Sequence, residues 1–212
     1  ILGALFIAAL ITCNLIANKF ISIDLGFKTF VISAGVLPYP ITFLITDILS
    51  ELYGQKRTTH VVLSGLFASI FVLFILWLGA QFPAIEGSPI DDETFNQVFQ
   101  NAWRVIAASM MAYIVAQLID VKLFHFWKRL TKGEMLWVRN NFSTVISQFV
   151  DTTLVVVILF FGVESWSTMG SYISDGWLFK VIFAALDTFI IYGFMAWARS
   201  YFKLKKGEEI EL

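Results

Sequence analysis

The sequence predicts an all-α integral membrane protein with six transmembrane helices, and three observations lead to this prediction. Hydrophobic residues make up 58% of the 212 residues, and charged residues only 15%, against roughly 25% in soluble domains. The mean hydropathy is +0.77. Apolar runs of about 20 residues, the length needed to cross a bilayer, recur along the chain. The expected helices cover approximately residues 1–19, 30–52, 60–81, 102–124, 141–163 and 177–200.

The first two expected helices differ in regularity. Residues 1–19 contain Cys13, the one cysteine of the chain, which excludes a disulfide framework and leaves Cys13 as a packing residue. This run lacks a small-residue cleavage site, so we expect no secretory signal, and the missing initiating Met suggests a start slightly inside the gene product. Residues 30–52 contain Pro38 and Pro40, and proline removes a backbone donor. We expect either a simple kink there or a broken helix of the kind that forms transporter substrate sites.

The later helices are joined by short polar segments, so the whole chain is expected to form one transporter domain, residues 1–212. The expected helix at 102–124 carries Gln117 and Asp120 three positions apart, on one face. On the helix near 141–163, polar residues recur every three or four positions and share a face. These residues are Asn140, Thr144, Ser147, Gln148 and Asp151.

Two interpretations of this polar face remain open. Ser, Thr, Asn and Gln residues commonly hold membrane helices together, at about 0.6 kcal/mol per contact. That interpretation suits the hydroxyl side chains. Packing does not require an ionisable group, so we expect Gln148 and Asp151 to have a function.

The orientation follows from the basic residues, because cytoplasmic flanks of spanning helices carry an excess of Lys and Arg. The second and fourth connections and the C-terminal tail hold 11 of the 15 basic residues. With six helices, this distribution places both termini in the cytoplasm. Tryptophan prefers the membrane interface, and all seven lie near expected helix ends: Trp77, Trp103, Trp127, Trp137, Trp166, Trp177 and Trp197.

Several carboxylates fall within the expected helices, where each costs roughly 2.5–3.5 kcal/mol at bilayer depth. Asp47 and Asp120 lie toward the inner ends of their helices, and Asp151 and Asp187 lie near the midplane. No cation lies within six residues of either midplane acid on its own helix, so an ion pair would need another helix. A further acid, Glu51, is interpreted as an interfacial residue that pairs with Lys56 or Arg57.

The chain also contains a weak internal repeat. The segment NLIANKF at 14–20 aligns with QLIDVKL at 117–123, and ITDIL around Asp47 aligns with FVDTT around Asp151. Two halves of three helices would form a 3+3 inverted repeat, as in many secondary transporters. The segments QLID and QFVD also resemble each other on neighbouring helices, which fits a paired site equally well.

Five segments resemble the bacterial queuosine precursor transporter family, also described as vitamin uptake transporters: six-helix proteins of the inner membrane. They are ANKF (17–20), ITFLITDILSELYG (41–54), AQLIDVKLFHFWKR (116–129), LWVRNNFSTVISQFVDT (136–152) and LDTFIIYGF (186–194). The resemblance implies a multi-pass protein of the bacterial inner membrane that imports a 7-deazaguanine. That substrate would be 7-cyano-7-deazaguanine or 7-aminomethyl-7-deazaguanine, salvaged for queuosine in tRNA.

Such a substrate suits buried acids and amides. A carboxylate can accept the N1–H and the exocyclic amino group together, an amide can donate to the carbonyl, and aromatic rings can stack on the base. We expect no catalytic residue, metal, cofactor or nucleic-acid partner, and leave a homo-oligomer open. The expected substrate-binding residues are Gln148 and Asp151 first, then Asp187, Asp47, Gln117, Asp120 and Asn141.

Three other classes of protein were weighed. A substrate-binding subunit of an energy-coupling-factor transporter is the main alternative, because Ala4 and Ala8 have the small-xxx-small spacing of close helix packing and no Walker A motif is present. A membrane enzyme is disfavoured, since His60 and His125 belong to no HExxH motif. A scaffold would leave the midplane acids unexplained. For energy coupling, Asp151 or Asp187 is expected to carry a proton, with facilitated diffusion as the alternative.

Overall fold

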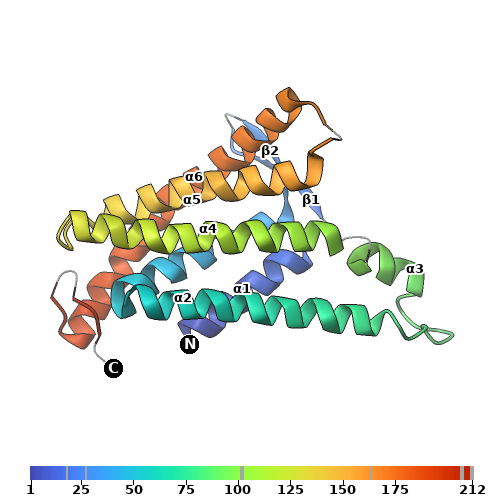
Figure 1. Cartoon of the computed structure of the whole chain (residues 1–212), viewed down its shortest axis with the longest axis horizontal. Helices are drawn as coiled ribbons and strands as arrows, with labels where there is room; N and C mark the ends of the chain where they lie inside the picture. Colours follow the sequence, from blue (N-terminus) through green and yellow to red (C-terminus); the bar gives the residue numbers. More distant parts are fainter. Residues whose placement is uncertain (18, 27, 101–102, 163, 206–207, 211–212) are drawn as a thin grey trace.

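The computed structural model describes the chain except residues 18, 27, 101–102, 163, 206–207 and 211–212. Five helices make up most of the molecule, and α2, α4, α5 and α6 are long (Figure 1). The elements in chain order are α1 (Leu2–Leu15), β1 (Phe20–Asp24), β2 (Thr29–Ser33), the 3-10 turn η1 (Ala34–Val36), α2 (Tyr39–Gly79), α3 (Asp92–Phe95), the π-helix η2 (Asn96–Gln100), α4 (Trp103–Leu130), α5 (Leu136–Phe160) and α6 (Trp166–Phe202).

Helix α2 contains a break at Gly54. This glycine has φ +79° and ψ 172°, and it separates two helical segments that correspond to the second and third expected helices. The positive φ is accessible to glycine at little cost. The expected proline kink is wrong, because Pro38 is the N-cap of α2 and Pro40 lies in its first turn. Proline is tolerated there since the first backbone N–H groups of a helix have no partner within it.

A β-hairpin was not expected from the sequence. Strands β1 and β2 pair antiparallel with Phe20 opposite Ser33, so residues 29–33 are strand and not the start of a helix. Both strands are rich in Ile, Val and Phe, which suit a pleated surface. The hairpin packs on α6, where the rings of Phe30 and Phe179 lie 5.3 Å apart. The all-α prediction is therefore correct for the bundle but wrong for this segment.

Membrane character is confirmed by the helices. Within the described residues, four helices are long and apolar enough to cross a bilayer: Ala34–Gly79, Ala107–Leu130, Leu136–Phe160 and Trp166–Phe202. The apolar α1 is shorter, with 14 residues. Large apolar side chains such as Phe67 and Phe189 are 70% and 78% exposed, which suits contact with lipid. The count of six crossings remains a prediction.

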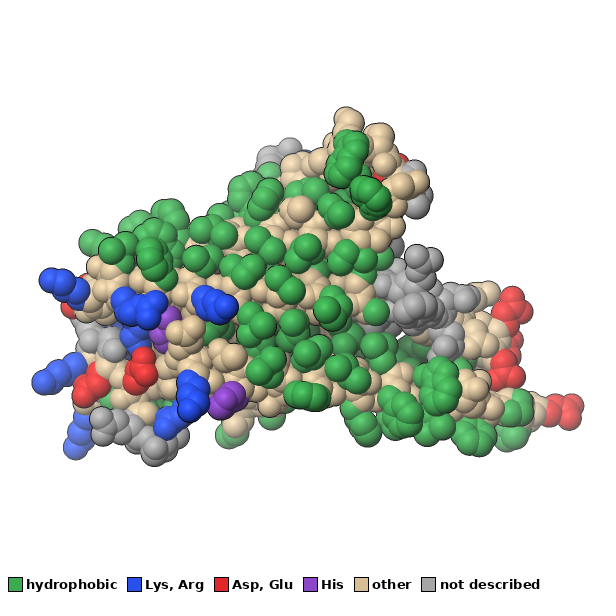
Figure 2. Space-filling model, in the orientation of Figure 1, with side chains coloured by type: hydrophobic (Ala, Val, Ile, Leu, Met, Phe, Trp, Pro, Cys, Tyr) green, Lys and Arg blue, Asp and Glu red, His purple; other side chains and the backbone are tan. Residues whose placement is uncertain are grey.

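Charge divides between the two ends of the molecule (Figure 2). Lys and Arg gather, with some Asp and Glu among them, at the end that holds the α4–α5 connection and the C-terminal residues, while the charged side chains visible around α3 at the opposite end are Asp and Glu. The fourth connection and the C-terminal tail, which carry many of the basic residues, therefore lie together in space. Lys206, one of the basic residues counted there, lies outside the described residues.

Candidate functional site

The interior of the bundle is unusually polar for a membrane protein. The face of α5 predicted from its spacing is buried, and it is continued by Ser143 and Thr152. Buried polar side chains also come from α2 and α4, including Thr46, Asp47, Gln117 and Asp120. Ionisable groups inside a membrane helix bundle normally pair or mark a pathway. Their contacts divide into a cavity, a carboxyl pair and an ion-pair cluster.

The cavity has a volume of about 110 Å³ and lies where α1, α2, α4, α5, α6 and the end of the hairpin meet. Tyr39 of α2 and Tyr113 of α4 form part of its wall, with ring centroids 5.2 Å apart in an edge-on arrangement. Cys13 and Asn14 of α1 also line it, so Cys13 borders a polar space as well as packing. Asp151 of α5 closes another side. The cavity thus combines aromatic surface with polar groups, the combination typical of small-molecule sites.

An ion pair joins Asp151 to Lys180 of α6 at this cavity. Lys180 Nζ lies 2.6 Å from Asp151 Oδ2 and 3.2 Å from Thr152 Oγ1, and 4.3 Å from the centroid of the Tyr39 ring. Asp151 is 1% exposed. The cation that its own helix lacks is therefore supplied by another helix. Asp151 Oδ1 has no hydrogen-bond partner among the described residues, and the Tyr39 hydroxyl lies close to the same carboxylate.

A small hollow of about 10 Å³ adjoins the cavity across Tyr39 and Lys180. Gln148 and Asp187, two predicted site residues, line this hollow together with Thr144. Its volume suits about one water molecule. Gln148 Oε1 is buried and has no partner in the described part of the chain. The structure therefore brings Gln148 and Asp187 next to the Asp151 pair.

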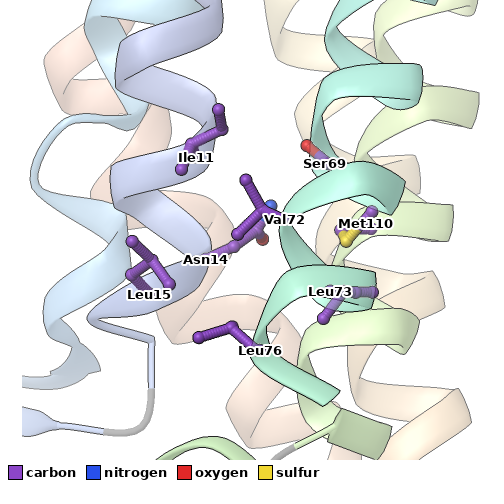
Figure 3. Close-up of a pocket in the computed structure, with 8 residues that line it drawn as sticks. All are labelled: Ile11, Asn14, Leu15, Ser69, Val72, Leu73, Leu76 and Met110. Atoms are coloured by element: carbon purple, nitrogen blue, oxygen red, sulfur yellow. The ribbon is translucent and has the colours of Figure 1, made fainter. Parts of the chain in front are cut away.

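A second hollow of similar size lies between α1 and α2 (Figure 3). Asn14 of α1 faces Val72 and Leu76 of α2, and Met110 of α4 completes the lining. Most of this lining is apolar, so the hollow is a packing gap. Asn14 borders both this gap and the cavity, and its Nδ2 has no partner among the described residues.

Gln117 connects the cavity wall to α2. Its Nε2 donates to Tyr113 Oη at 2.7 Å, and its Oε1 accepts from Thr46 Oγ1 at 3.2 Å. Asp47 follows Thr46 on α2, and its carboxyl group lies within hydrogen-bonding reach of Asp120 on α4. Neither acid lines the cavity or the hollow beside it. Three predicted residues thus form a network adjoining the cavity.

Asn141 lies apart from the other predicted site residues. Its Nδ2 donates to Thr188 Oγ1 of α6 at 2.7 Å and to the Trp137 carbonyl at 3.0 Å. This contact holds α5 against α6, the packing role that polar residues commonly have in membranes. Asp120 of the segment QLID contacts Ser147, the residue before QFVD, while Asp151 of QFVD contacts Lys180. A site shared by the two segments remains a prediction.

The prediction for Glu51 is wrong. Glu51 is 1% exposed and binds Arg139 through two hydrogen bonds, at 2.6 and 3.1 Å, in the forked geometry that guanidinium favours. Arg199 lies 2.9 Å away and Lys128 lies 3.8 Å away, whereas Arg57 instead donates to the Ile210 carbonyl. Glu51 of α2 is therefore buried among three cations, one each from α4, α5 and α6, and it holds these helices together.

Arg139 and Lys180 were missed as interior residues, although the sequence contained a signal for each. Arg139 precedes Ser143 by four positions and therefore continues the polar face of α5. Lys180 stands alone in an apolar stretch of α6, where an intramembrane cation requires an acid on a neighbouring helix. Tyr39 and Tyr113 carried no comparable signal.

Comparison with known proteins agrees with the resemblance drawn from the motifs. A family model described as "Putative vitamin uptake transporter" matches residues 33–194. A "Probable queuosine precursor transporter" of Bacillus subtilis (strain 168) is 28% identical over 158 residues, covering 74% of this chain and 65% of that protein. The protein of the same name in Haemophilus influenzae (strain ATCC 51907 / DSM 11121 / KW20 / Rd) is 26% identical, covering 68% and 56%.

A third relative, the "Queuosine precursor transporter" of Escherichia coli (strain K12), is 23% identical and covers 80% of this chain and 73% of that protein. The chain thus spans less than two thirds of the length of the first two relatives. No solved structure matches it. Because the family model covers most of the chain, and the quoted motifs fall largely within the matched residues, the chain belongs to the vitamin uptake transporter family.

Proposed function

We propose that this protein imports a queuosine precursor, 7-cyano-7-deazaguanine or 7-aminomethyl-7-deazaguanine, across the bacterial inner membrane. The names of three relatives support the substrate class. The observation that carries the proposal for this chain is the cavity of about 110 Å³ with an ion pair and two tyrosines in its wall. A buried charged pair in a membrane protein costs free energy and commonly marks a binding site or a pathway.

The cavity offers complementary groups for a flat, polar base. The Oδ1 atom of Asp151 can accept the N1–H or the amino group, and Lys180 can donate to the carbonyl. Tyr39 and Tyr113 supply aromatic surface, worth about 1–3 kcal/mol per stacked base. Asn14 Nδ2 is a further donor, suited to the nitrile nitrogen of the cyano substituent at position 7. Gln148 and Asp187 extend the same polar surface toward α6.

The test is precursor salvage in cells that cannot synthesise the precursor. With this gene present, added precursor should restore queuosine in tRNA, and without it the tRNA should remain unmodified. A cavity variant, Asp151→Ala, serves as the matched negative control if it is inserted at normal levels. Absence of queuosine in cells that contain well-expressed wild-type protein would refute the proposal.

A substrate-binding subunit of an energy-coupling-factor transporter remains the second candidate. Ala4 and Ala8 are both exposed on the surface of α1, where a partner helix could approach closely. Copurification with an ATPase module, and uptake that depends on that module, would favour this candidate. Uptake by the purified protein alone would exclude it.

A further inference from the structure

Two carboxyl groups meet inside the bundle at a place that the cavity does not use. Asp47 of α2 is 2% exposed and Asp120 of α4 is fully buried, and their carboxyl groups lie within hydrogen-bonding reach of each other. The hydroxyl of Ser147 on α5 donates to Asp120 Oδ1 at 2.9 Å. The hydroxyls of Ser143 and Thr144 lie within reach of the same carboxyl group.

One oxygen of each acid lacks a donor. Asp47 Oδ1 and Asp120 Oδ2 are buried and have no hydrogen-bond partner within the described residues. Two ionised carboxylates in contact would repel each other strongly in a low-dielectric interior. A single shared proton removes the repulsion and supplies the missing hydrogen bond. The pair therefore has the geometry of a site for one proton.

The charged groups around Asp47 include one acid and one cation from neighbouring helices. Asp187 of α6 and Arg139 of α5 are the charged groups from the neighbouring helices that act on Asp47. Arg139 is already engaged, because its donors bind Glu51 and the carbonyls of Gly133 and Glu134. By contrast, Lys180 directly neutralises Asp151. Asp151 is therefore less suited to carry the proton than the pair of Asp47 and Asp120, because Lys180 already compensates its charge.

We propose that Asp47 and Asp120 form the proton-binding site that couples import to the proton gradient, an inference that rests on the proposed function. Asp120 is the ionised partner, because it accepts from the α5 hydroxyls, and Asp47 holds the proton and donates it to Asp120. A metal ion suits the pair poorly: oxygen-bound cations take six or more ligands, and the described residues contain no group of three or more acids, His or Cys placed to hold one.

Two hydrogen bonds connect the substrate cavity to the residue next to Asp47. Tyr113, in the cavity wall, accepts from Gln117, and Gln117 accepts from Thr46, the residue before Asp47. Substrate that reorients Tyr113 would therefore disturb the contact between α2 and α4 at the proton site. In one cycle, one neutral 7-cyano-7-deazaguanine and one proton enter together from outside, both are released inside, and one positive charge moves inward.

The experiment uses purified full-length protein in liposomes with labelled 7-cyano-7-deazaguanine. Two rates are measured: exchange of labelled for unlabelled substrate at equal pH, and net accumulation under an inward proton gradient. With one proton per substrate, a pH difference of about one unit supports about ten-fold accumulation. The central variant is Asp47→Asn, because its amide can donate permanently to Asp120 and so imitates the protonated acid. The matched control is Glu86→Gln, an exposed acid outside the long helices.

We expect Asp47→Asn to keep exchange and to lose accumulation, while Glu86→Gln behaves as wild type. Accumulation by Asp47→Asn equal to that of wild type would overturn the inference, as would wild-type accumulation driven by a sodium gradient alone. If Asp47→Asn does not assemble, proton entry is followed with a pH dye during wild-type transport. About one proton per substrate supports the site, and none overturns it. Absence of exchange by the wild-type protein would instead refute the proposed function.

Discussion

At the scale of single residues, the Asp151–Lys180 pair is the most informative contact in the cavity. Both side chains are largely buried, and removing one member of a buried pair leaves the other charge without compensation, which typically costs about 3–5 kcal/mol. The pair can therefore contribute to folding as well as to binding. A test of its role in transport has to separate the two effects.

The first prediction compares Asp151→Asn with the double variant Asp151→Asn/Lys180→Met. The single variant should lose uptake and stability, because the lysine ammonium is then buried alone. The double variant should regain assembly and thermal stability but not uptake, because Asp151 Oδ1 and the lysine donor are both lost. Uptake and melting temperature in detergent are the measurements.

A matched control for this prediction is the exposed ion pair between Lys28 and Asp175. Its side chains are 37% and 48% exposed, and such pairs contribute about 0–1 kcal/mol. Asp175→Asn should therefore leave both uptake and melting temperature close to those of wild type. Normal uptake by the Asp151→Asn variant would show that Asp151 serves packing and not transport.

The second prediction concerns Glu51, whose carboxylate binds two arginines and lies near Lys128. Glu51→Gln keeps the size but removes the charge that compensates three cations, so it should destabilise the fold by about 3–5 kcal/mol. For a chain of this length, that corresponds to a fall in melting temperature of roughly 6–20 °C. An unchanged melting temperature would show that the buried cations are compensated in some other way.

At the scale of elements, the break in α2 organises one end of the bundle. Close to the interruption at Gly54, the Leu52 carbonyl accepts a hydrogen bond from the backbone N–H of Ile210 at 2.6 Å. Glu209 reaches Lys128 at 3.0 Å. The C-terminal residues therefore satisfy groups that the broken helix and the Glu51 cluster expose.

The third prediction is that Gly54→Ala destabilises the protein through its backbone. Alanine at φ +79° and ψ 172°, a region that essentially only glycine adopts, costs about 1–3 kcal/mol, and its Cβ would also collide with the Glu209 carboxylate. Because the Glu209 side chain can move, the double variant Gly54→Ala/Glu209→Ala should recover only part of the loss. The comparison is made by thermal unfolding in detergent.

Gly193→Ala is the control for this substitution. Gly193 lies within α6 with no atom near its added Cβ, so alanine there should be neutral or stabilise the helix by up to about 1 kcal/mol. Equal melting temperatures for Gly54→Ala and Gly193→Ala would contradict a conformational requirement at the break.

At the scale of the whole molecule, the separation of charge predicts its orientation in the membrane. The basic end carries the α4–α5 connection and the C-terminal residues, and the acidic end carries α3 (Figure 2). Since Lys and Arg accumulate on cytoplasmic flanks, the basic end should face the cytoplasm. The division of α2 at Gly54 is consistent with six crossings, which the same experiment tests.

The fourth prediction is that reporter fusions after Lys132 and at the C-terminus read as cytoplasmic, and a fusion after Asp92 reads as periplasmic. An activity reporter and a fluorescent reporter with opposite compartment requirements provide the control for expression. The reverse readout at all three positions would invert the proposed direction of the substrate pathway, and a mixed readout would reject the six-crossing arrangement.

The sequence by itself determined the properties that depend on composition and local spacing. The membrane class, the positions of the long helices and the buried polar face of α5 follow from residues that are neighbours along the chain. Burial of Asp47, Asp120 and Asp151 could be predicted for the same reason. The hairpin was missed because its strands are as apolar as a membrane helix. They are also too short to show clearly the alternation of apolar and polar residues that identifies a strand.

Only the tertiary structure decided which charges meet. Lys180 lies 29 positions from Asp151, and Glu51 lies 88 positions from Arg139, so nothing in the local pattern selects these partners. Several acids and cations inside the bundle offered alternative pairings, and the rotation and depth of each packed helix determine which of them come within a few ångströms. The distinction between a neutralised acid at the cavity and a carboxyl pair that can share a proton therefore arises from helix packing.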